Sequence, residues 1–201
     1  DAFAEIIVVV GGIMIGLPLP ITAAQILWIN LISDGFPGLA LTIDPKRVNI
    51  MKEKPRPPKE KLVNRWMIVL ISLVSLTAGL IALSSFVIVY KITNDIAIAR
   101  SVAFITLGLN SLAYVFSVRS LMTPFWENHL FENKWLVVAV IAGLGLQIVP
   151  FTTPSFRQFF GLSELGLIYW IAAISLSILM FFVIEVFKMG YKLNFVKHWI
   201  K

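Results

Sequence analysis

The sequence predicts an all-α membrane protein, a bundle of six transmembrane helices, from three observations. The chain is 58% hydrophobic and 14% charged, with a mean hydropathy of +0.87, which is too apolar for an ordinary soluble domain. Six apolar segments approach the roughly 20 residues that a helix needs to cross a bilayer. Lysine and arginine gather in alternate connections between them. The expected spans are residues 3–17, 24–43, 66–90, 98–118, 135–151 and 165–186.

The 17 Lys and Arg residues predict the orientation. Fourteen lie in the segments after the second and fourth spans and in the C-terminal tail, whereas Lys91, Arg100 and Arg157 lie on the other side. The positive-inside rule therefore places the C-terminus in the cytoplasm. The short loops and brief tail favour a multi-pass protein of a prokaryotic plasma membrane. The chain opens at Asp1 on an apolar run without a basic n-region, so we interpret it as a piece of a longer protein that starts inside a helix.

Several classes of function lack support in the sequence. The absence of cysteine disfavours thiolate metal sites, and both His129 and His198 fall in loop or tail sequence, where solvation is expected. The basic residues follow the membrane pattern, which argues against nucleic acid as a partner. The sequence contains no nucleotide-binding fingerprint. The proline-rich KPRPPKEKL, residues 54–62, is interpreted as a stiff cytoplasmic connector, with an adaptor ligand as the alternative.

The second span carries an unusual polar face. Asn30, Ser33 and Asp34 are spaced by three and four residues and fall on one side of a helix. Pro37 lacks an N–H and would free the carbonyl of Ser33, so the helix is expected to be broken near Gly35–Gly38. Carboxylate, amide, hydroxyl and carbonyl oxygens at membrane depth form the shell that hard cations prefer. The sequence therefore predicts a cation site here.

The alternative is that this face only joins helices, with Asp34 paired to a Lys or Arg. No basic residue lies in the apolar part of the other expected spans, which disfavours that pairing. An unpaired aspartate at the bilayer centre costs about 2.5–3.5 kcal/mol on insertion scales. A cation or a proton is expected to neutralise it.

Glu5 is the second membrane acid. It lies on the preceding span, and the short GLPLPITA turn makes the two spans antiparallel neighbours. The carboxylates of Glu5 and Asp34 could therefore face one another across a shared cavity. An interfacial position for Glu5 is the alternative.

Two further polar groups lie on later spans. Asn110, Ser111 and Tyr114 share one face of the fourth span, and Asn110 and Ser111 are further candidate cation ligands, with hydrogen bonding between helices as the alternative. Glu185 and Lys188 are three residues apart on the sixth span and are expected to form a local ion pair.

Four segments together resemble a known family. LWINLISDGFPGLAL followed by DP is similar to the sixth membrane helix of type II P-type cation-transporting ATPases, which include the sarcoplasmic reticulum calcium pump. GLPLPITAAQILWIN resembles the turn before that helix, RPPKEKLVNRW the following cytoplasmic loop, and NKWLV the start of the ninth helix. The resemblance covers essentially residues 1–201 as the C-terminal transmembrane segment of such a pump.

The resemblance also implies residue roles. Glu5, Asn30, Ser33 and Asp34 fall on calcium ligands of the calcium pump, with serine in place of a threonine. Two positions depart from its ligand set. Ala2 falls where that pump has an asparagine, and Ser111 where it has a glutamate, which weakens the case for two calcium ions per cycle.

The resemblance implies an ATP-driven pump, with Ca²⁺ the leading cargo and manganese, sodium and potassium as alternatives. ATP and Mg²⁺ would act only through domains upstream of this chain, with the upstream phosphorylation domain as the partner, so no ATPase activity is expected from these 201 residues alone. When the cation leaves, two poorly solvated acids would remain, and at least one is expected to take up a proton. An ATP-independent cation channel or ion-coupled carrier is the second hypothesis, and a purely structural membrane module is the third.

Overall fold

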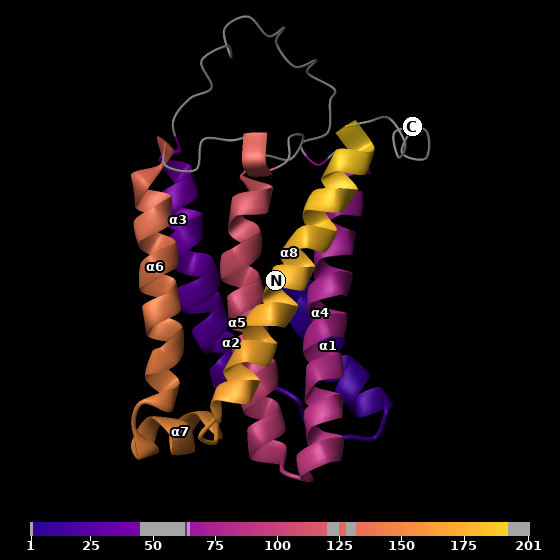
Figure 1. The fold of residues 1–201 in the computed structure, drawn as a ribbon, viewed down its shortest axis with the longest axis vertical. Helices are drawn as coiled ribbons and strands as arrows, with labels where there is room; N and C mark the ends of the chain where they lie inside the picture. Colours follow the sequence, from indigo (N-terminus) through magenta and orange to yellow (C-terminus); the bar gives the residue numbers. More distant parts are fainter. Residues whose placement is uncertain (1, 45–62, 64, 120–124, 128–131, 193–201) are drawn as a thin grey trace, which may run out of the picture.

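The computed structural model describes residues 2–44, 63, 65–119, 125–127 and 132–192, and these residues are all helix, turn or loop (Figure 1). The segment 54–62, His129 and His198 lie outside the described residues. The described elements are α1 (Ala2–Met14), α2 (Ala23–Ile29), η1 (Asn30–Gly35), α3 (Phe36–Thr42), α4 (Arg65–Thr93), α5 (Ile96–Val118), η3 (Phe125–Glu127), α6 (Lys134–Ile148), η5 (Val149–Phe151), α7 (Pro154–Phe160) and α8 (Leu167–Lys192).

The all-helical membrane fold is confirmed, while the count of six spans stays a prediction. Among the described residues, four stretches are long and apolar enough to cross a membrane: α4, α5, α8 and the continuous run of α6 and η5. The first expected span is represented by α1, which has 13 residues, and the second is divided among α2, η1 and α3. Such a chain is a multi-pass membrane protein.

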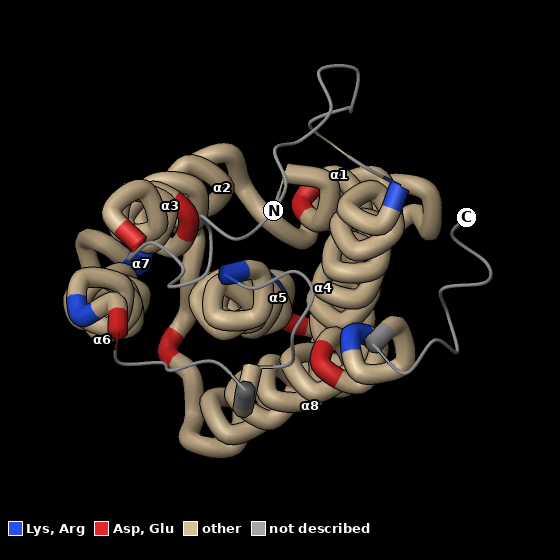
Figure 2. The backbone as a smooth tube through the Cα atoms, turned by 90° about the horizontal axis from the view of Figure 1, so that it is seen from above, with Lys and Arg blue, Asp and Glu red and all other residues tan. Residues whose placement is uncertain are grey.

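Helix α5 forms the centre of the bundle, and the other long helices surround it (Figure 2). In α5, 72% of the most apolar window is buried, against 33% or less in the other three long stretches. Small residues such as Ala99, Ala103 and Gly108 permit this close packing from several sides. The residues that α5 presents to its neighbours are therefore fixed by contacts on every face.

The turn between α1 and α2 fixes these two elements side by side. A Cβ added at Gly12 would lie 2.5 Å from the Pro20 ring, so the chain folds back tightly on α1. Thr22 then begins α2 with a capping box, because its backbone N–H donates to Gln25 Oε1 at 3.0 Å and its hydroxyl accepts from the Gln25 N–H. The Gln25 amide also donates to the Phe160 carbonyl at 2.8 Å, which ties α2 to the end of α7.

Two polar networks join the helices at the opposite end of the bundle. The Arg119 guanidinium, at the end of α5, donates to both oxygens of Asp44 at 3.0 and 3.1 Å. Asn133 begins α6 and donates to Asp44 at 2.8 Å and to the Ala40 carbonyl at 2.9 Å. These bonds hold the ends of α3, α5 and α6 together.

The second network contains Glu185 and Lys188 and confirms the ion pair expected between them. It also corrects the expectation that the other spans contain no basic residue. The ammonium of Lys188 lies 3.0 Å from Glu185, and both side chains are fully buried. Helix α8 runs to Lys192, beyond the expected end at residue 186, so a basic residue does lie inside a span, although it pairs with Glu185. Glu185 also accepts from the Ser117 hydroxyl and, at 2.6 Å, from the Phe125 N–H, while Lys188 donates to the Ser117 carbonyl at 2.8 Å.

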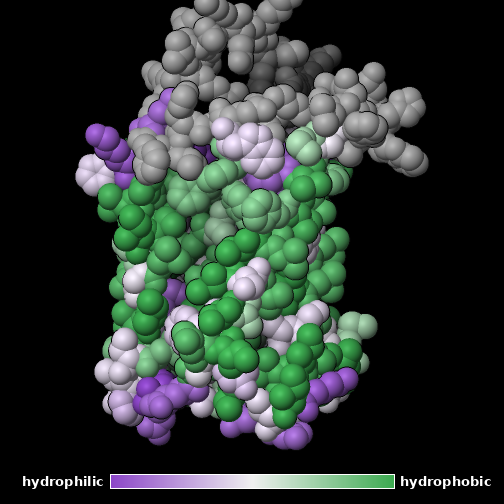
Figure 3. Space-filling model, viewed as in Figure 1, coloured by the Kyte–Doolittle hydropathy of each residue, from purple (hydrophilic) through white to green (hydrophobic). Residues whose placement is uncertain are grey.

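The outer surface of the bundle is a hydrophobic belt, with hydrophilic residues near the lower end (Figure 3). Large apolar side chains are exposed along it, including Leu76 and Ile88 on α4, Ile141 on α6 and Ile171 on α8. Exposing such a large apolar surface to water is unfavourable, whereas contact with lipid tails carries no such free-energy cost. The surface is that of a protein that lies in a bilayer.

Candidate cation site

The polar face of the second span lies on a widened stretch of helix. Residues Asn30–Gly35 form a π-helix, and α3 continues from Phe36 with Pro37 in its first turn. Because Pro37 has no N–H, it cannot bond to the carbonyl of Ser33, and the preceding turns are widened instead of stopped. The irregular second span is thus confirmed, with its irregular turns at Asn30–Gly35, before the predicted 35–38.

Glu5 lies against this widened helix, and only 6% of it is exposed. The side-chain amide of Asn30 donates to Glu5 Oε1 at 3.1 Å and to Oε2 at 3.2 Å. Glu5 is therefore buried against η1 and not exposed on the surface of the bundle, and its depth in the membrane stays a prediction. The tight packing of α1 on α4 supports the arrangement, since a Cβ on Gly79 would approach the side chain of Ile7 to 2.8 Å.

Asp34 is held by the central helix. The Ser111 hydroxyl donates to Asp34 Oδ1 at 2.5 Å, a charge-assisted bond between α5 and η1. Tyr114 lies one turn along α5 and forms a side-chain hydrogen bond with Ser111. No basic side chain is described beside Asp34, and its hydrogen-bond partner among the described residues is the Ser111 hydroxyl.

Two side chains beside these acids have unsatisfied oxygen atoms. Ser33 and Asn110 are each 1% exposed, and neither the Ser33 hydroxyl nor the Asn110 amide has a hydrogen-bond partner among the described residues. A buried polar group without a partner costs about 1–3 kcal/mol. Their sequence neighbours, Asp34 and Ser111, bond to each other across η1 and α5.

The structure joins four of the six predicted ligands in two hydrogen-bonded pairs, Glu5 with Asn30 and Asp34 with Ser111, and buries Ser33 and Asn110 next to them in the sequence. Glu5 comes from α1; Asn30, Ser33 and Asp34 from η1; Asn110 and Ser111 from α5. The described residues contain no group of three His, Cys, Asp or Glu side chains that could hold a metal by themselves. The arrangement offers two carboxylates with amide and hydroxyl oxygens, a donor set that suits a hard cation.

Sequence reasoning did not single out Thr106, one turn before Asn110 on α5. Its hydroxyl is fully buried and has no hydrogen-bond partner among the described residues. The spacing of four residues from Thr106 to Asn110, and again to Tyr114, places the three on one face of the helix. That spacing is the signal that could have extended the polar face of α5 by one turn.

Comparison with known proteins decides the family. The family model described as "Cation transporting ATPase, C-terminus" matches residues 18–190. This chain belongs to that family. The expected membership of the P-type cation-transporting ATPases is therefore confirmed, and the chain is a transmembrane segment of that kind.

Three curated relatives carry related names. The chain is 34% identical over 177 residues to a "Calcium-transporting ATPase" of Bacillus subtilis, covering 86% of this chain and 19% of the relative. It is 31% identical over 205 residues to a "Calcium-transporting ATPase 1" of Bacillus cereus, covering 94% and 23%. It is 28% identical over 194 residues to a "Calcium-transporting ATPase 1" of Lactococcus lactis, covering 96% and 22%. The chain thus spans about a fifth of the length of the relatives it matches.

Proposed function

We propose that this chain is the ion-translocating segment of an ATP-driven pump that carries Ca²⁺ across a prokaryotic plasma membrane. The observation that supports the proposal most strongly is that each of two membrane acids accepts a hydrogen bond from a neutral amide or hydroxyl side chain of a neighbouring element. Glu5 is bonded by Asn30 and Asp34 by Ser111, beside the unsatisfied groups of Ser33 and Asn110. Two negative charges and several neutral oxygens match the needs of a divalent hard cation.

Calcium is favoured over other hard cations by charge and by ligand flexibility. Ca²⁺ accepts six to eight oxygen ligands in irregular geometry, whereas Mg²⁺ demands a near-ideal octahedron and retains several waters. The six ligands proposed here come from three separate elements and combine carboxylate, amide and hydroxyl groups, which favours the irregular shell. The names of the relatives agree with this choice.

Each side chain has a proposed role. Glu5 and Asp34 supply the negative charge, and Asn30, Ser33, Asn110 and Ser111 supply neutral oxygens. In the structure Asn30 and Ser111 donate hydrogen bonds to the acids, so a cation that enters would take the place of these donors on the carboxylates. A shift of α1 relative to η1 would separate Glu5 from Asn30 and open the site.

The energy for that shift would come from the rest of the protein. We propose that a phosphorylation domain in the same parent chain binds ATP and Mg²⁺ and drives α1 and η1 between two arrangements. The six proposed membrane crossings would place the C-terminus in the cytoplasm, on the same side as that domain. When the cation is absent, Glu5 and Asp34 would be adjacent acids with little water, so proton uptake in exchange for the cation is also proposed.

The experiment that tests this function is cation uptake into inside-out vesicles that contain the intact protein. Uptake of ⁴⁵Ca²⁺ is measured with ATP, without ATP and with a non-hydrolysable analogue, and a pH-sensitive dye in the vesicle lumen follows proton movement. The proposal predicts uptake only with ATP, together with loss of protons from the lumen. Calcium flux that needs no ATP would favour the channel or ion-coupled carrier instead.

A further inference from the structure

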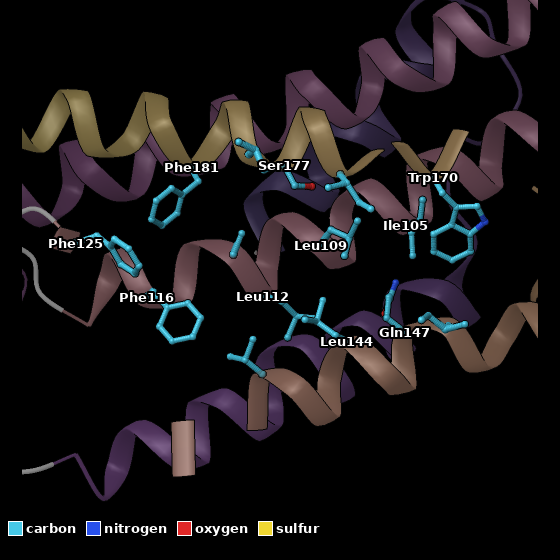
Figure 4. A pocket seen from close by; sticks show the side chains of 15 residues that line it. Ile105, Leu109, Leu112, Phe116, Phe125, Leu144, Gln147, Trp170, Ser177 and Phe181 are labelled. Atoms are coloured by element: carbon cyan, nitrogen blue, oxygen red, sulfur yellow. The ribbon is translucent and has the colours of Figure 1, made fainter. Parts of the chain in front are cut away.

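A second feature of the bundle lies apart from the candidate cation site. A groove of about 540 Å³ runs between α5, α6 and α8. At one end it is closed by Phe116, Phe125 and Phe181, whose rings meet edge to face at 6.2 and 5.0 Å, and Trp170 lies at the other end (Figure 4). Pockets of 300–1,000 Å³ with mostly apolar walls are typical binding sites for small ligands.

The wall of the groove is mostly apolar, and the Gln147 amide oxygen is a buried polar atom without a hydrogen-bond partner among the described residues. Gln147 and Ser177 both line it. The Gln147 amide donates to the backbone carbonyl of Phe104 at 3.5 Å, and the Ser177 hydroxyl donates to the Ala173 carbonyl at 3.0 Å. Their donors are thus directed to backbone carbonyls of the helices, and the groove is suited to a hydrocarbon.

The groove opens onto the lipid-facing surface. Leu144 and Ile148 on α6 and Ile174 and Ile178 on α8 line it, and each of them is 40–51% exposed. These residues are part of the exposed apolar surface of the bundle. The groove is therefore continuous with the surface that contacts the bilayer, and a lipid could enter it sideways between α6 and α8.

The length and the position of the groove indicate its occupant. From Trp170 to Phe181 the groove extends along α8 for about 16 Å, which is close to half of a bilayer core of about 30 Å. A hydrocarbon chain of one leaflet spans that same half of the core. Because the groove opens sideways to the hydrophobic belt, the hydrocarbon chains of the surrounding lipid are the apolar groups that can reach it.

We propose that this groove binds one acyl chain of a membrane phospholipid. If the groove were empty, its wall atoms would lack dispersion contacts on one side. Water is a poor occupant, because it can form few hydrogen bonds in a mostly apolar cavity. Because the groove lies outside the cation ligands, the proposal is independent of the ion that the protein carries.

The test is native mass spectrometry of the intact protein, purified from membranes in mild detergent. We compare the wild-type protein with Leu144→Trp, which fills the groove, and with Ile141→Trp as the matched control. Ile141 is on the same helix, is 64% exposed and does not line the groove. Ala113→Phe, which narrows the groove from α5, is a second filling variant in case Leu144→Trp cannot be purified.

The proposal predicts one retained phospholipid on the wild-type protein and on Ile141→Trp. Occupancy should fall by about tenfold or more in a filling variant, because an acyl chain and the added ring cannot share the groove. A wild-type protein that retains no phospholipid would overturn the proposal. Equal lipid occupancy in the filling variants and the control would overturn it too, as would a polypeptide in place of the lipid.

Discussion

The side-chain amide of Asn30 lies 3.1 and 3.2 Å from the two carboxylate oxygens of Glu5 and so bonds η1 to α1. This contact joins the two elements that any opening of the candidate site must separate. It also orients the Asn30 amide oxygen away from Glu5, where a cation could reach it. Asn30 is therefore expected to act as a cation ligand and, in the cation-free state, to hold η1 against α1.

Asn30→Ala should weaken the apparent affinity for Ca²⁺ by roughly ten- to a hundredfold, since it removes the amide oxygen that Asn30 would offer to the cation. The measurement is the Ca²⁺ dependence of ATP hydrolysis by the intact protein. Thr42→Ala is the control, because Thr42 is an exposed residue of α3 whose hydroxyl bonds only to the Leu39 carbonyl among the described contacts. An unchanged affinity in Asn30→Ala would remove Asn30 from the site.

Ser111→Ala removes the hydroxyl that donates to Asp34 at 2.5 Å. This hydroxyl positions the acid before the cation enters and would then offer its oxygen to the cation, so the apparent affinity for Ca²⁺ should fall by roughly tenfold without it. Ser84→Ala, on the exposed side of α4, is the matched control. If both serine variants titrate with Ca²⁺ as the wild-type protein does, α5 plays no part in holding Asp34 for binding.

Pro37→Ala supplies the N–H that can bond to the Ser33 carbonyl. The widened turns of η1 should then revert toward regular α-helix, because nothing in the backbone prevents the normal bond. We expect the thermal stability to stay equal or rise while the Ca²⁺ affinity falls by about tenfold or more, since Ser33 and Asp34 rotate around the helix. The two quantities are measured on the same preparation.

Pro154→Ala is the control for that experiment. Pro154 begins α7, where the missing N–H has no intrahelical partner in any case, so its removal should change neither quantity. A Pro37→Ala protein that binds Ca²⁺ with wild-type affinity would show that the π-helix is incidental to the site.

The buried pair of Glu185 and Lys188 should matter for stability and not for the cation site. Glu185→Leu leaves the fully buried Lys188 ammonium without its carboxylate and should cost about 3–5 kcal/mol of unfolding free energy. The double variant Glu185→Leu with Lys188→Leu should recover most of that loss. Glu164→Leu, which breaks the more exposed pair with Arg157, should cost at most about 1 kcal/mol.

Unfolding of these variants is measured in detergent by circular dichroism. If the single Glu185 variant were as stable as the double variant, the network that joins α8 to Ser117 and Phe125 would contribute little. The Ca²⁺ affinity of all three variants should match that of the wild-type protein.

The long helices were predictable because each has a long apolar run with polar ends. The expected spans 66–90 and 98–118 agree closely with α4 (Arg65–Thr93) and α5 (Ile96–Val118). The exact turns of the π-helix were not predictable, because they depend on tertiary partners as well as on Pro37. Asn30 is drawn toward Glu5 on another helix, and Gly35 lies with its Cβ position 3.4 Å from the Asn30 carbonyl.

The candidate site was also predictable only in part. Spacing within one helix placed Asn30, Ser33 and Asp34 together, and the short turn made Glu5 a neighbour. The bond between Ser111 and Asp34 depends on how α5 is rotated in the bundle, which a single sequence does not specify. The acyl-chain groove could not be predicted from the sequence either, because its walls form only when α5, α6 and α8 pack together.

The central claim is that Glu5 and Asp34 bind the transported cation, and equilibrium binding of ⁴⁵Ca²⁺ to the intact purified protein tests it most directly. Glu5→Gln and Asp34→Asn keep the shape of each side chain and remove its charge. Asp95→Asn is the matched control, because Asp95 is an exposed N-cap of α5 and asparagine caps helices equally well. The account predicts that each site variant loses binding by about a hundredfold or more while Asp95→Asn binds normally. Wild-type binding by both site variants would contradict it.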